Sequence, residues 1–391
     1  MRAVVYRGVN DLRLETVPVP RIGANELLIK VAVCGVCPTD IKKIQHGTVP
    51  PPRIFGHETA GTIVKMGSGV SRLGFGFKIG GRVALHHHIP CLDCHFCRHR
   101  AFAQCATYKR TGITAGFEPA GGGYAEYVRV MPFVLPGVVK IPAKNSFEEG
   151  AMLEPVNTVL KAVRRLNLLR GDIVLVAGQG PIGLMFTRLL QLQGVRVLAT
   201  DLLASRLRLA RKFGARWTRL VESRAPGVEG KKSLILDRRL SSLDAAIVAV
   251  PSDTVVQEAL QLVRPGGQVL LFAHTKRLAQ SGRADLPVSR AAEHRRPTIS
   301  HSDSQPIGAA KLGEDDSSLD FSSICLDEKD LIGSYSSDFT LQREVARLVF
   351  SRQLDVRGLI THRFPLEQTA AAVQLAARPA SDSLKILVTQ S

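Results

Sequence analysis

Four cysteines within fifteen residues constrain this chain more than any other feature of its sequence. They are Cys91, Cys94, Cys97 and Cys105, with the spacing Cys-x-x-Cys-x-x-Cys-x7-Cys. Each Cys-x-x-Cys step lets two sulfurs converge on one ion, and the last cysteine closes the cage from the far side of a loop. Four protein ligands leave no open position on a tetrahedral ion. The run therefore predicts a structural zinc site in a lobe at about residues 86–110.

Length and cysteine usage narrow the class of protein. The chain has 391 residues, of which 45% are hydrophobic, and this length suggests two domains. Only seven cysteines occur and four of them are clustered, which is typical of an intracellular metal protein and not of a disulfide scaffold. The N-terminus begins as a strand pattern without the apolar core of a signal peptide. We therefore expect a cytoplasmic protein with no membrane partner.

The charge balance is strongly basic, with a net charge of +18 and a pI of about 10.0. Such a balance can mark a nucleic-acid-binding protein. Here, however, the Lys and Arg residues are dispersed along helical patterns such as 205–212, without a nucleic-acid motif or interleaved aromatic residues. The pattern favours a solvated basic surface that attracts anionic ligands. We expect no specific nucleic-acid partner.

The character of the sequence changes near Val156. The first 155 residues are rich in Gly, Pro and Val, with short strand-like runs at 26–33 and 60–64. They predict a mainly-β, barrel-like domain. Beyond Val156 a helical pattern at 156–168 is followed by alternating strands and helices, which predicts α/β architecture with a doubly wound parallel sheet. The polar, charged stretch Arg277–Ser318 interrupts this pattern and is predicted to be a largely disordered surface insertion.

A glycine motif follows the first strand of the α/β part. The apolar run 173–177 leads directly into Gly178-Gln-Gly180-Pro181-Ile182-Gly183, and an apolar helix pattern follows. A strand before and a helix after are the context in which this motif binds a dinucleotide. Gly178 would permit the tight turn, Gly180 the approach of a diphosphate, and Gly183 close helix–strand packing. The diphosphate would lie at the N-terminal end of the helix.

Asp201 ends the next strand, eighteen residues after Gly183. A carboxylate there can accept hydrogen bonds from the adenosine ribose and would repel a 2′-phosphate, so NAD is favoured over NADP. The alternative is that Asp201 caps the helix that follows. Arg206 could stack on the adenine ring or be one more surface arginine.

A second set of motifs precedes the cysteine cluster. Cys37-Pro-Thr39-Asp40 is followed by Gly56-His57-Glu58, which extends as Gly-His-Glu-x2-Gly-x5-Gly-x2-Val. With the four-cysteine lobe and the glycine motif, these elements stand in the order found in the zinc-dependent medium-chain dehydrogenase/reductase family. The chain resembles this alcohol dehydrogenase superfamily over nearly its whole length apart from the insertions. Within it, the resemblance is to the sorbitol and threonine dehydrogenase branches.

The resemblance implies a GroES-like β-barrel catalytic domain formed by residues 1–155 together with 339–391, and a Rossmann NAD-binding domain formed by 156–338. It implies two zinc ions per chain, NAD as cofactor, and a homodimer or homotetramer. The catalytic zinc would be bound by Cys37, His57, Glu58 and Glu154, with the carboxylates binding directly or through water.

Further roles come from the same resemblance. Asp40 would orient the His57 ring, and Thr39 would pass the substrate hydroxyl proton toward solvent. His88 matches a histidine that approaches the active site in threonine dehydrogenases, although a plain polar loop residue is the alternative. Lys385 stands where the family often has a basic residue near the cofactor diphosphate, and it could equally be an ordinary strand lysine. Cys34 and Cys325 are predicted to have no chemical role.

The activity that this implies is the oxidation of a small alcohol, secondary or polyol-like, to a ketone or aldehyde with hydride transfer to NAD. L-threonine 3-dehydrogenase is an alternative because of His88 and Glu154. A protein of a different class, which binds NAD or zinc but is catalytically silent, is a second alternative, and the Arg277–Ser318 insertion is its support. One departure from the family pattern is Gly80-Gly81-Arg82-Val83, where a Gly-Asp-Arg-Val sequence is usual.

Overall fold

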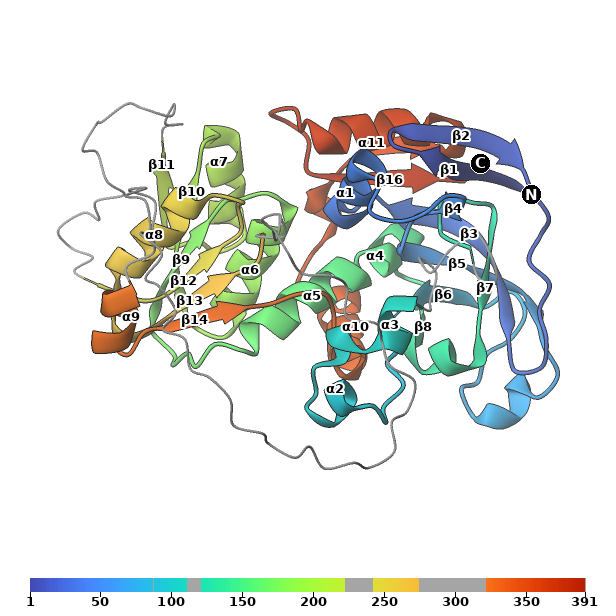
Figure 1. The fold of residues 1–391 in the computed structure, drawn as a ribbon, viewed down its shortest axis with the longest axis horizontal. Coiled ribbons are helices and arrows are strands. Elements are labelled where there is room, and N and C mark those ends of the chain that lie inside the picture. Colours follow the sequence, from blue (N-terminus) through green and yellow to red (C-terminus); the bar gives the residue numbers. More distant parts are fainter. Residues whose placement is uncertain (87, 111–120, 222–241, 274–320, 391) are drawn as a thin grey trace, which may run out of the picture.

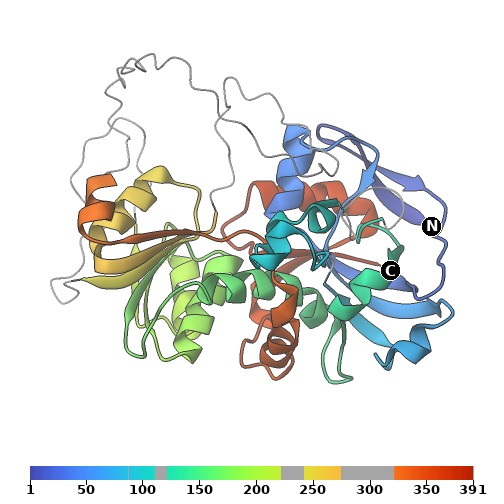
Figure 2. The same cartoon turned by 60° about the horizontal axis from the view of Figure 1, so that its bottom comes forward.

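The computed structural model describes residues 1–86, 88–110, 121–221, 242–273 and 321–390. The predicted insertion Arg277–Ser318 lies outside these ranges. Two bodies lie side by side, each built around its own sheet, and helix α5 (Leu153–Val163) runs from one to the other (Figures 1 and 2). The chain crosses from one body to the other along α5 and returns after Gly333.

The first body is a six-stranded parallel sheet in the order β11-β10-β9-β12-β13-β14. Its central strands are continuous apolar runs, as expected for strands covered by helices on both faces. The strands are β9 (Ile173–Ala177), β10 (Arg196–Asp201), β11 (Trp217–Leu220), β12 (Leu243–Val248), β13 (Val263–Leu271) and β14 (Asp330–Gly333). The helices are α6 (Pro181–Leu192), α7 (Ala204–Lys212), α8 (Asp253–Leu262) and α9 (Phe321–Leu326).

The second body contains a seven-stranded, largely antiparallel sheet in the order β15-β16-β3-β5-β6-β8, with β7 also paired to β3. A three-stranded sheet, β2-β1-β4, lies beside it. The strands are β1 (Arg2–Gly8), β2 (Asp11–Thr16), β3 (Leu27–Gly35), β4 (Arg53–Ile54), β5 (Glu58–Met66), β6 (Arg82–Leu85), β7 (Tyr127–Val130), β8 (Val138–Lys140), β15 (Ile360–Pro365) and β16 (Lys385–Thr389). The C-terminal strand β16 pairs with β3 in the register Val388↔Cys34, so the two ends of the chain share one sheet.

Short helices complete the second body. They are α1 (Pro38–His46), α2 (His95–Arg98), α3 (Ala106–Arg110), α4 (Phe147–Ala151), α10 (Gln342–Phe350) and α11 (Thr369–Ala377), with 3₁₀ turns η1 (Val70–Leu73), η2 (Phe102–Gln104), η3 (Pro132–Gly137), η4 (Phe339–Leu341), η5 (Arg357–Leu359) and η6 (Leu366–Gln368). A barrel-like β domain and a doubly wound parallel sheet are thus both present, and the predicted fold class is confirmed.

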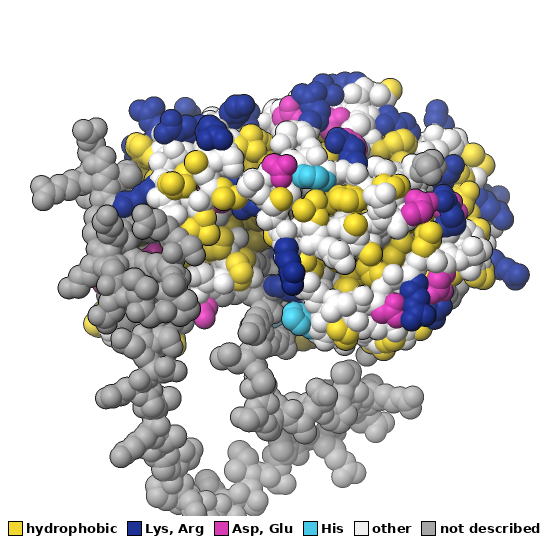
Figure 3. All heavy atoms as spheres, turned by 90° about the horizontal axis from the view of Figure 1, so that it is seen from above, with side chains coloured by type: hydrophobic (Ala, Val, Ile, Leu, Met, Phe, Trp, Pro, Cys, Tyr) yellow, Lys and Arg dark blue, Asp and Glu magenta, His cyan; other side chains and the backbone are white. Residues whose placement is uncertain are grey.

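Lys and Arg side chains occur over both bodies and are interspersed with acidic and hydrophobic ones on the face drawn in Figure 3. This distribution agrees with the dispersed basic surface inferred from the sequence. Within the described ranges, no helix combines the length and the apolar character that crossing a bilayer requires.

A polar clamp holds the second crossing between the bodies, which runs from Gly333 to η4. The Asn157 side chain of α5 donates to Gln342 Oε1 at 3.0 Å and accepts from the Asp338 backbone N–H at 2.8 Å. Lys161, one turn further along α5, donates to the Tyr335 carbonyl at 2.8 Å. Asn157 is fully buried, so its amide has exchanged water for these two partners.

Replacing Asn157 with Ala should destabilise the protein by about 1–3 kcal/mol, because both partners lose a hydrogen bond in a buried setting. Differential scanning calorimetry would show this as a lower Tm. The exposed Gln193 is the matched control, and Gln193→Ala should change stability by less than about 0.5 kcal/mol. Equal melting temperatures for the two variants would contradict the clamp.

Candidate metal centres and cofactor site

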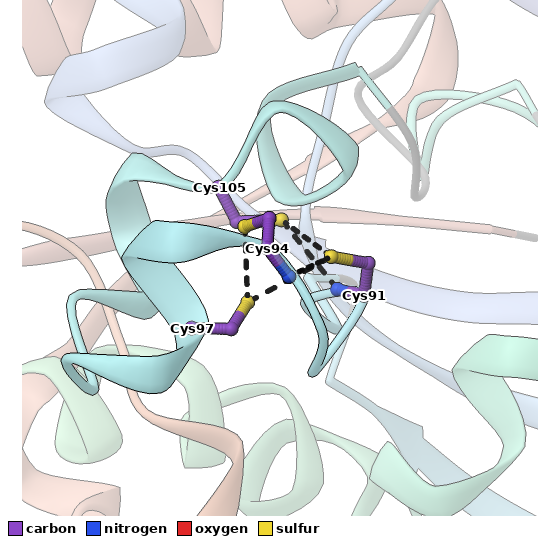
Figure 4. A group of neighbouring side chains, drawn as sticks. All are labelled: Cys91, Cys94, Cys97 and Cys105. Atoms are coloured by element: carbon purple, nitrogen blue, oxygen red, sulfur yellow. Dashed lines mark hydrogen bonds between the residues drawn. The ribbon is translucent and has the colours of Figure 1, made fainter. Parts of the chain in front are cut away.

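The four cysteines of the lobe converge on one point, as Figure 4 shows. Sulfur–sulfur distances are 3.9 Å for Cys91–Cys97, 3.5 Å for Cys94–Cys97 and 3.7 Å for Cys91–Cys105. Four sulfurs at about 2.3 Å from a central zinc, arranged as a tetrahedron, would lie about 3.8 Å from one another. The cluster therefore fits a tetrahedral Zn²⁺ with four thiolate ligands.

Local backbone geometry supports this arrangement. Backbone N–H groups of Cys91 and Cys94 point at the sulfurs of Cys105 and Cys91, at 3.5 and 3.4 Å. Burial opposes ionisation of Cys105, but these and other backbone N–H groups outweigh it and lower the pKa of that thiol to about 6. Burial raises the pKa of Cys97 to about 12, so a bound cation is needed to hold all four side chains as thiolates.

A second cluster forms where β3, α1 and β5 meet. Cys37 is the N-cap residue of α1, two residues after β3 ends, while His57 and Glu58 stand at the start of β5. Ligand atoms of these three residues all lie within 4.8 Å of one another. In the ladder between β3 and β5, Glu58 is opposite Gly35, and this register brings motifs that are twenty residues apart onto one site.

The imidazole of His57 is oriented by a buried carboxylate. Its Nδ1 lies 3.1 Å from Asp40 Oδ1, and the Asp40 side chain is fully buried. Burial disfavours the imidazolium, but the charges of Asp40 and Cys37 outweigh that effect and raise the pKa of His57 well above its usual value. With Nδ1 engaged by Asp40, Nε2 is the nitrogen that can bind a metal, which is the usual pairing at metal-bound histidines.

Glu58 is also paired with a buried lysine. Lys385 of β16 forms an ion pair with Glu58 and donates to the Val36 carbonyl at 3.0 Å. Burial alone would lower the pKa of Lys385, but the charges of Glu58 and Cys37 raise it. Lys385, which the resemblance placed near the cofactor diphosphate, thus lies beside the metal cluster, and its pairing with Glu58 could not be predicted because β16 is remote in the chain.

Glu154 lies near this cluster without belonging to the group of three. It occupies the first turn of α5 and is buried, and burial raises its pKa to about 7. The charges of His57 and Glu58 also act on its pKa, in opposite directions. A cation nearby would favour the ionised form of this carboxyl group.

His88 lies near the second cluster, because the charge of His57 acts on its ring. Its ring stacks on Tyr108 with centroids 4.5 Å apart. Burial lowers the pKa of His88 well below its usual value, and the charges of His57, Lys43 and His86 lower it further. The Tyr108 hydroxyl in turn contacts Ser336 and Ser337, with 3.2 Å to the Ser337 Oγ, and so links the cysteine lobe to the second crossing.

The two remaining cysteines belong to neither of the two groups of metal ligands. Cys34 is fully buried against Thr59, and burial raises the pKa of its thiol to about 12. Cys325 is exposed on α9. All seven thiols are free, so the structure contains no disulfide.

The glycine motif forms a loop between β9 and α6. Gly178 has φ of 91°, in the left-handed region that favours glycine, and its N–H donates to the Thr200 carbonyl at 2.8 Å. A Cβ on Gly183 would collide with the Gly178 carbonyl, so this glycine allows α6 to pack against the strand. A Cβ on Gly180 would meet only open space, and that space is where a diphosphate would approach the backbone. Pro181 and Ile182 form the first turn of α6.

Asp201 lies at the end of β10, beside this loop. Its carboxylate accepts hydrogen bonds from the Gln179 N–H at 2.6 Å and the Leu203 N–H at 2.9 Å. Arg206 lies 3.9 Å from the same carboxylate. Helix α7 begins at Ala204 with Leu203 as its N-cap residue, so Asp201 precedes the cap and reaches the loop instead.

Comparison with known proteins agrees with this architecture. Residues 23–143 match the model of the alcohol dehydrogenase GroES-like domain, and residues 181–305 match that of zinc-binding dehydrogenases. Sorbitol dehydrogenase of Bombyx mori is 29% identical, covering 99% of this chain and 97% of the relative. A protein of Emericella nidulans named "Probable D-xylulose reductase A" is 30% identical, covering 67% of this chain and 72% of its own. Galactitol-1-phosphate dehydrogenase of Escherichia coli superposes with a TM-score of 0.74 at 25% identity, covering 100% of both chains.

Two bodies of these kinds, with a glycine loop in the first and both the cysteine- and histidine-containing clusters in the second, define a metal-dependent dehydrogenase that uses a nicotinamide dinucleotide. The chain belongs to the zinc-dependent medium-chain dehydrogenases of the alcohol dehydrogenase superfamily.

Replacing Cys94 with Ser should remove zinc from the lobe and lower the Tm, because three thiolates and a hydroxyl bind zinc more weakly than four thiolates. Zinc content by plasma mass spectrometry and calorimetric melting would measure both effects. Cys325→Ser is the matched control, since Cys325 is exposed and far from the lobe in sequence. Full zinc content in Cys94→Ser would contradict a four-cysteine site.

Replacing Gly35 with Ala should disturb the second cluster selectively. A Cβ there would lie 2.9 Å from Glu58 Cδ and 3.0 Å from Lys385 Cε, so the buried carboxylate has to move away from Cys37 and His57. We expect zinc to be lost from this cluster while the lobe keeps its own. Gly8→Ala, where a Cβ meets nothing within 4 Å, is the control. Unchanged zinc content in Gly35→Ala would contradict the placement of Glu58.

Proposed function

We propose that this protein oxidises a small alcohol, secondary or polyol-like, to a ketone or aldehyde and transfers the hydride to NAD. The observation that carries the proposal is the cluster of Cys37, His57 and Glu58, whose ligand atoms lie within 4.8 Å of one another while Asp40 orients the histidine. The relatives act, by their names, on sorbitol, D-xylulose and galactitol 1-phosphate, all of which belong to polyol chemistry.

Cys37, His57 and Glu58 would hold the catalytic zinc, with Glu154 completing the set directly or through a water molecule. One thiolate, one imidazole and carboxylates form a hard, exchangeable donor set that leaves a position for a substrate oxygen. The ion would supply a Lewis acid that lowers the pKa of the substrate hydroxyl. Lys385 offsets the negative charge of Glu58 within the protein.

Thr39, in the first turn of α1, would accept the proton of the substrate hydroxyl and pass it toward solvent. Asp40 keeps the His57 ring in the orientation that presents Nε2 to the metal. Residues at the boundary of the two bodies would exclude water when the bodies close on the bound substrate.

In the first body, Gly178, Gly180 and Gly183, with Pro181 and Ile182, would form the binding site of the NAD diphosphate at the N-terminus of α6. The nicotinamide would supply the hydride acceptor. Asp201 would bind the adenosine ribose and disfavour a 2′-phosphate, which supports NAD over NADP. Arg206 would lie near the adenine.

A specific observation favours L-threonine 3-dehydrogenase as a second candidate. His88 lies close enough to His57 for the two charges to interact, and a histidine in this position is a feature by which the chain resembles threonine dehydrogenases.

Three further properties are proposed. The four-cysteine lobe supports a second, structural zinc ion in each chain. Seven free cysteines support a reducing, cytoplasmic compartment. Family membership supports a homodimer or homotetramer.

Zinc-replete enzyme should form NADH from NAD⁺ with one substrate class in a panel of secondary alcohols, polyols and L-threonine. Cys37→Ser should lower kcat by at least about a thousandfold, since the metal's stabilisation of charge in the transition state is lost. Absorbance at the NADH band measures turnover, and calorimetric titration with NADH checks that the variant still binds cofactor.

Turnover of a polyol would support the polyol branch, and turnover of L-threonine the second candidate. Unchanged turnover in Cys37→Ser would contradict the assignment of this cluster as the catalytic zinc site. A flat panel with normal NADH binding and full zinc content would favour a protein that binds its cofactors without catalysis.

A further inference from the structure

Lys43 lies on the face of α1 that carries Thr39. The two residues are four apart in the helix, so their side chains are neighbours one turn from each other. Both are half-buried, whereas Pro38 and Lys42, which precede each of them in the chain, are exposed. Helix α1 belongs to the second body and lies on the side of it that is turned toward the first body, as Figure 1 shows. Lys43 therefore shares the face of α1 from which Thr39 would meet a substrate.

Basic side chains lie near this position. Lys43 is close enough to His88 for its charge to lower the pKa of that ring, after the larger effect of burial. Among the described residues, the other groups whose charges act on His88 are His57 and His86. His88 itself is held in place by stacking on Tyr108.

Lys43 differs from the other cations near the two sites. Lys385 is paired with Glu58, and Arg206 lies beside Asp201. Among the residues that the structure describes, no carboxylate forms an ion pair with Lys43, although the side chain is partly removed from solvent. A half-buried ammonium without a counter-charge gains most from an anion that enters the site with it.

We propose that Lys43 binds an anionic group of the substrate, one helical turn from the hydroxyl that Thr39 contacts, so that the preferred substrates are alcohols bearing a phosphate or a carboxylate. This inference rests on the proposed function, because it assigns the substrate class of the same site. The metal ligands and Thr39 do not decide between neutral and anionic alcohols, because they would act on the hydroxyl group that both kinds share. Lys43 would make that choice. Lys43 is then a specificity-determining residue.

The test compares D-sorbitol with D-sorbitol 6-phosphate and D-gluconate on zinc-replete enzyme with saturating NAD⁺. Wild-type enzyme should favour an anionic compound in kcat/KM, and the phosphate and carboxylate arms show which anion fits. Lys43→Met should lower kcat/KM for that compound by about tenfold to a hundredfold, mainly through KM, as expected for loss of one charge-assisted hydrogen bond. It should leave D-sorbitol within about twofold. Lys43→Arg should retain most of the preference.

Lys42→Met is the matched control, because it removes an exposed charge from the same helix and should change neither substrate's kinetics. The inference is overturned if wild-type enzyme uses D-sorbitol as well as both anionic compounds. It is equally overturned if Lys43→Met lowers both classes alike, or only raises KM for NAD⁺, which would place the cofactor diphosphate at Lys43.

A binding measurement separates this inference from the proposed function. Calorimetric titration of D-sorbitol 6-phosphate and of D-gluconate into the NADH-loaded enzyme should show weaker binding in Lys43→Met than in wild type. If no alcohol is oxidised, the proposed function fails, and these titrations still decide whether Lys43 binds an anion. Equal affinities of wild type and Lys43→Met for both anionic compounds would overturn the inference.

Discussion

The buried contact between His57 and Asp40 is the interaction on which the second body depends. It joins the start of β5 to α1, and it sets the direction of the imidazole nitrogen that can bind a metal. Because Asp40 is fully buried, its charge is compensated within the protein and not by water. Helix α1 follows Cys37, its N-cap residue, and carries Thr39 and Lys43, so this one helix would position the proposed metal ligand, proton acceptor and anion-binding residue together.

Charge balance around this contact is achieved by parts of the chain that are far apart. Cys37, Asp40, Glu58 and Glu154 place several acidic groups in a buried volume, and Lys385 enters from the C-terminal strand to pair with one of them. Strand β16 lies against β3, which ends two residues before Cys37. The C-terminal segment therefore contributes to the site electrostatically as well as completing the sheet.

Several elements could be predicted from local pattern, and others could not. Strand β9 was predicted with both ends correct, because its apolar run ends at a glycine that requires a left-handed backbone. Helix α5 was predicted to begin at Val156, but it begins at Leu153. Pro155 lies inside the first turn of α5, where the N–H that proline lacks is not needed. Strand β13 begins at Val263, so it includes the Pro-Gly-Gly sequence that precedes its apolar half.

The sequence by itself determined the two-body fold, the four-cysteine lobe and the glycine loop, because each is encoded by residues close together whose spacing has few physical uses. It also named Cys37, His57 and Glu58 as candidates. Only the tertiary structure decided that Lys385 pairs with Glu58, that Tyr108 supports His88, and that Lys43 stands beside Thr39 without a carboxylate partner among the described residues. The reason is that burial and charge pairing depend on which strands and helices pack together, and local spacing carries no record of that packing.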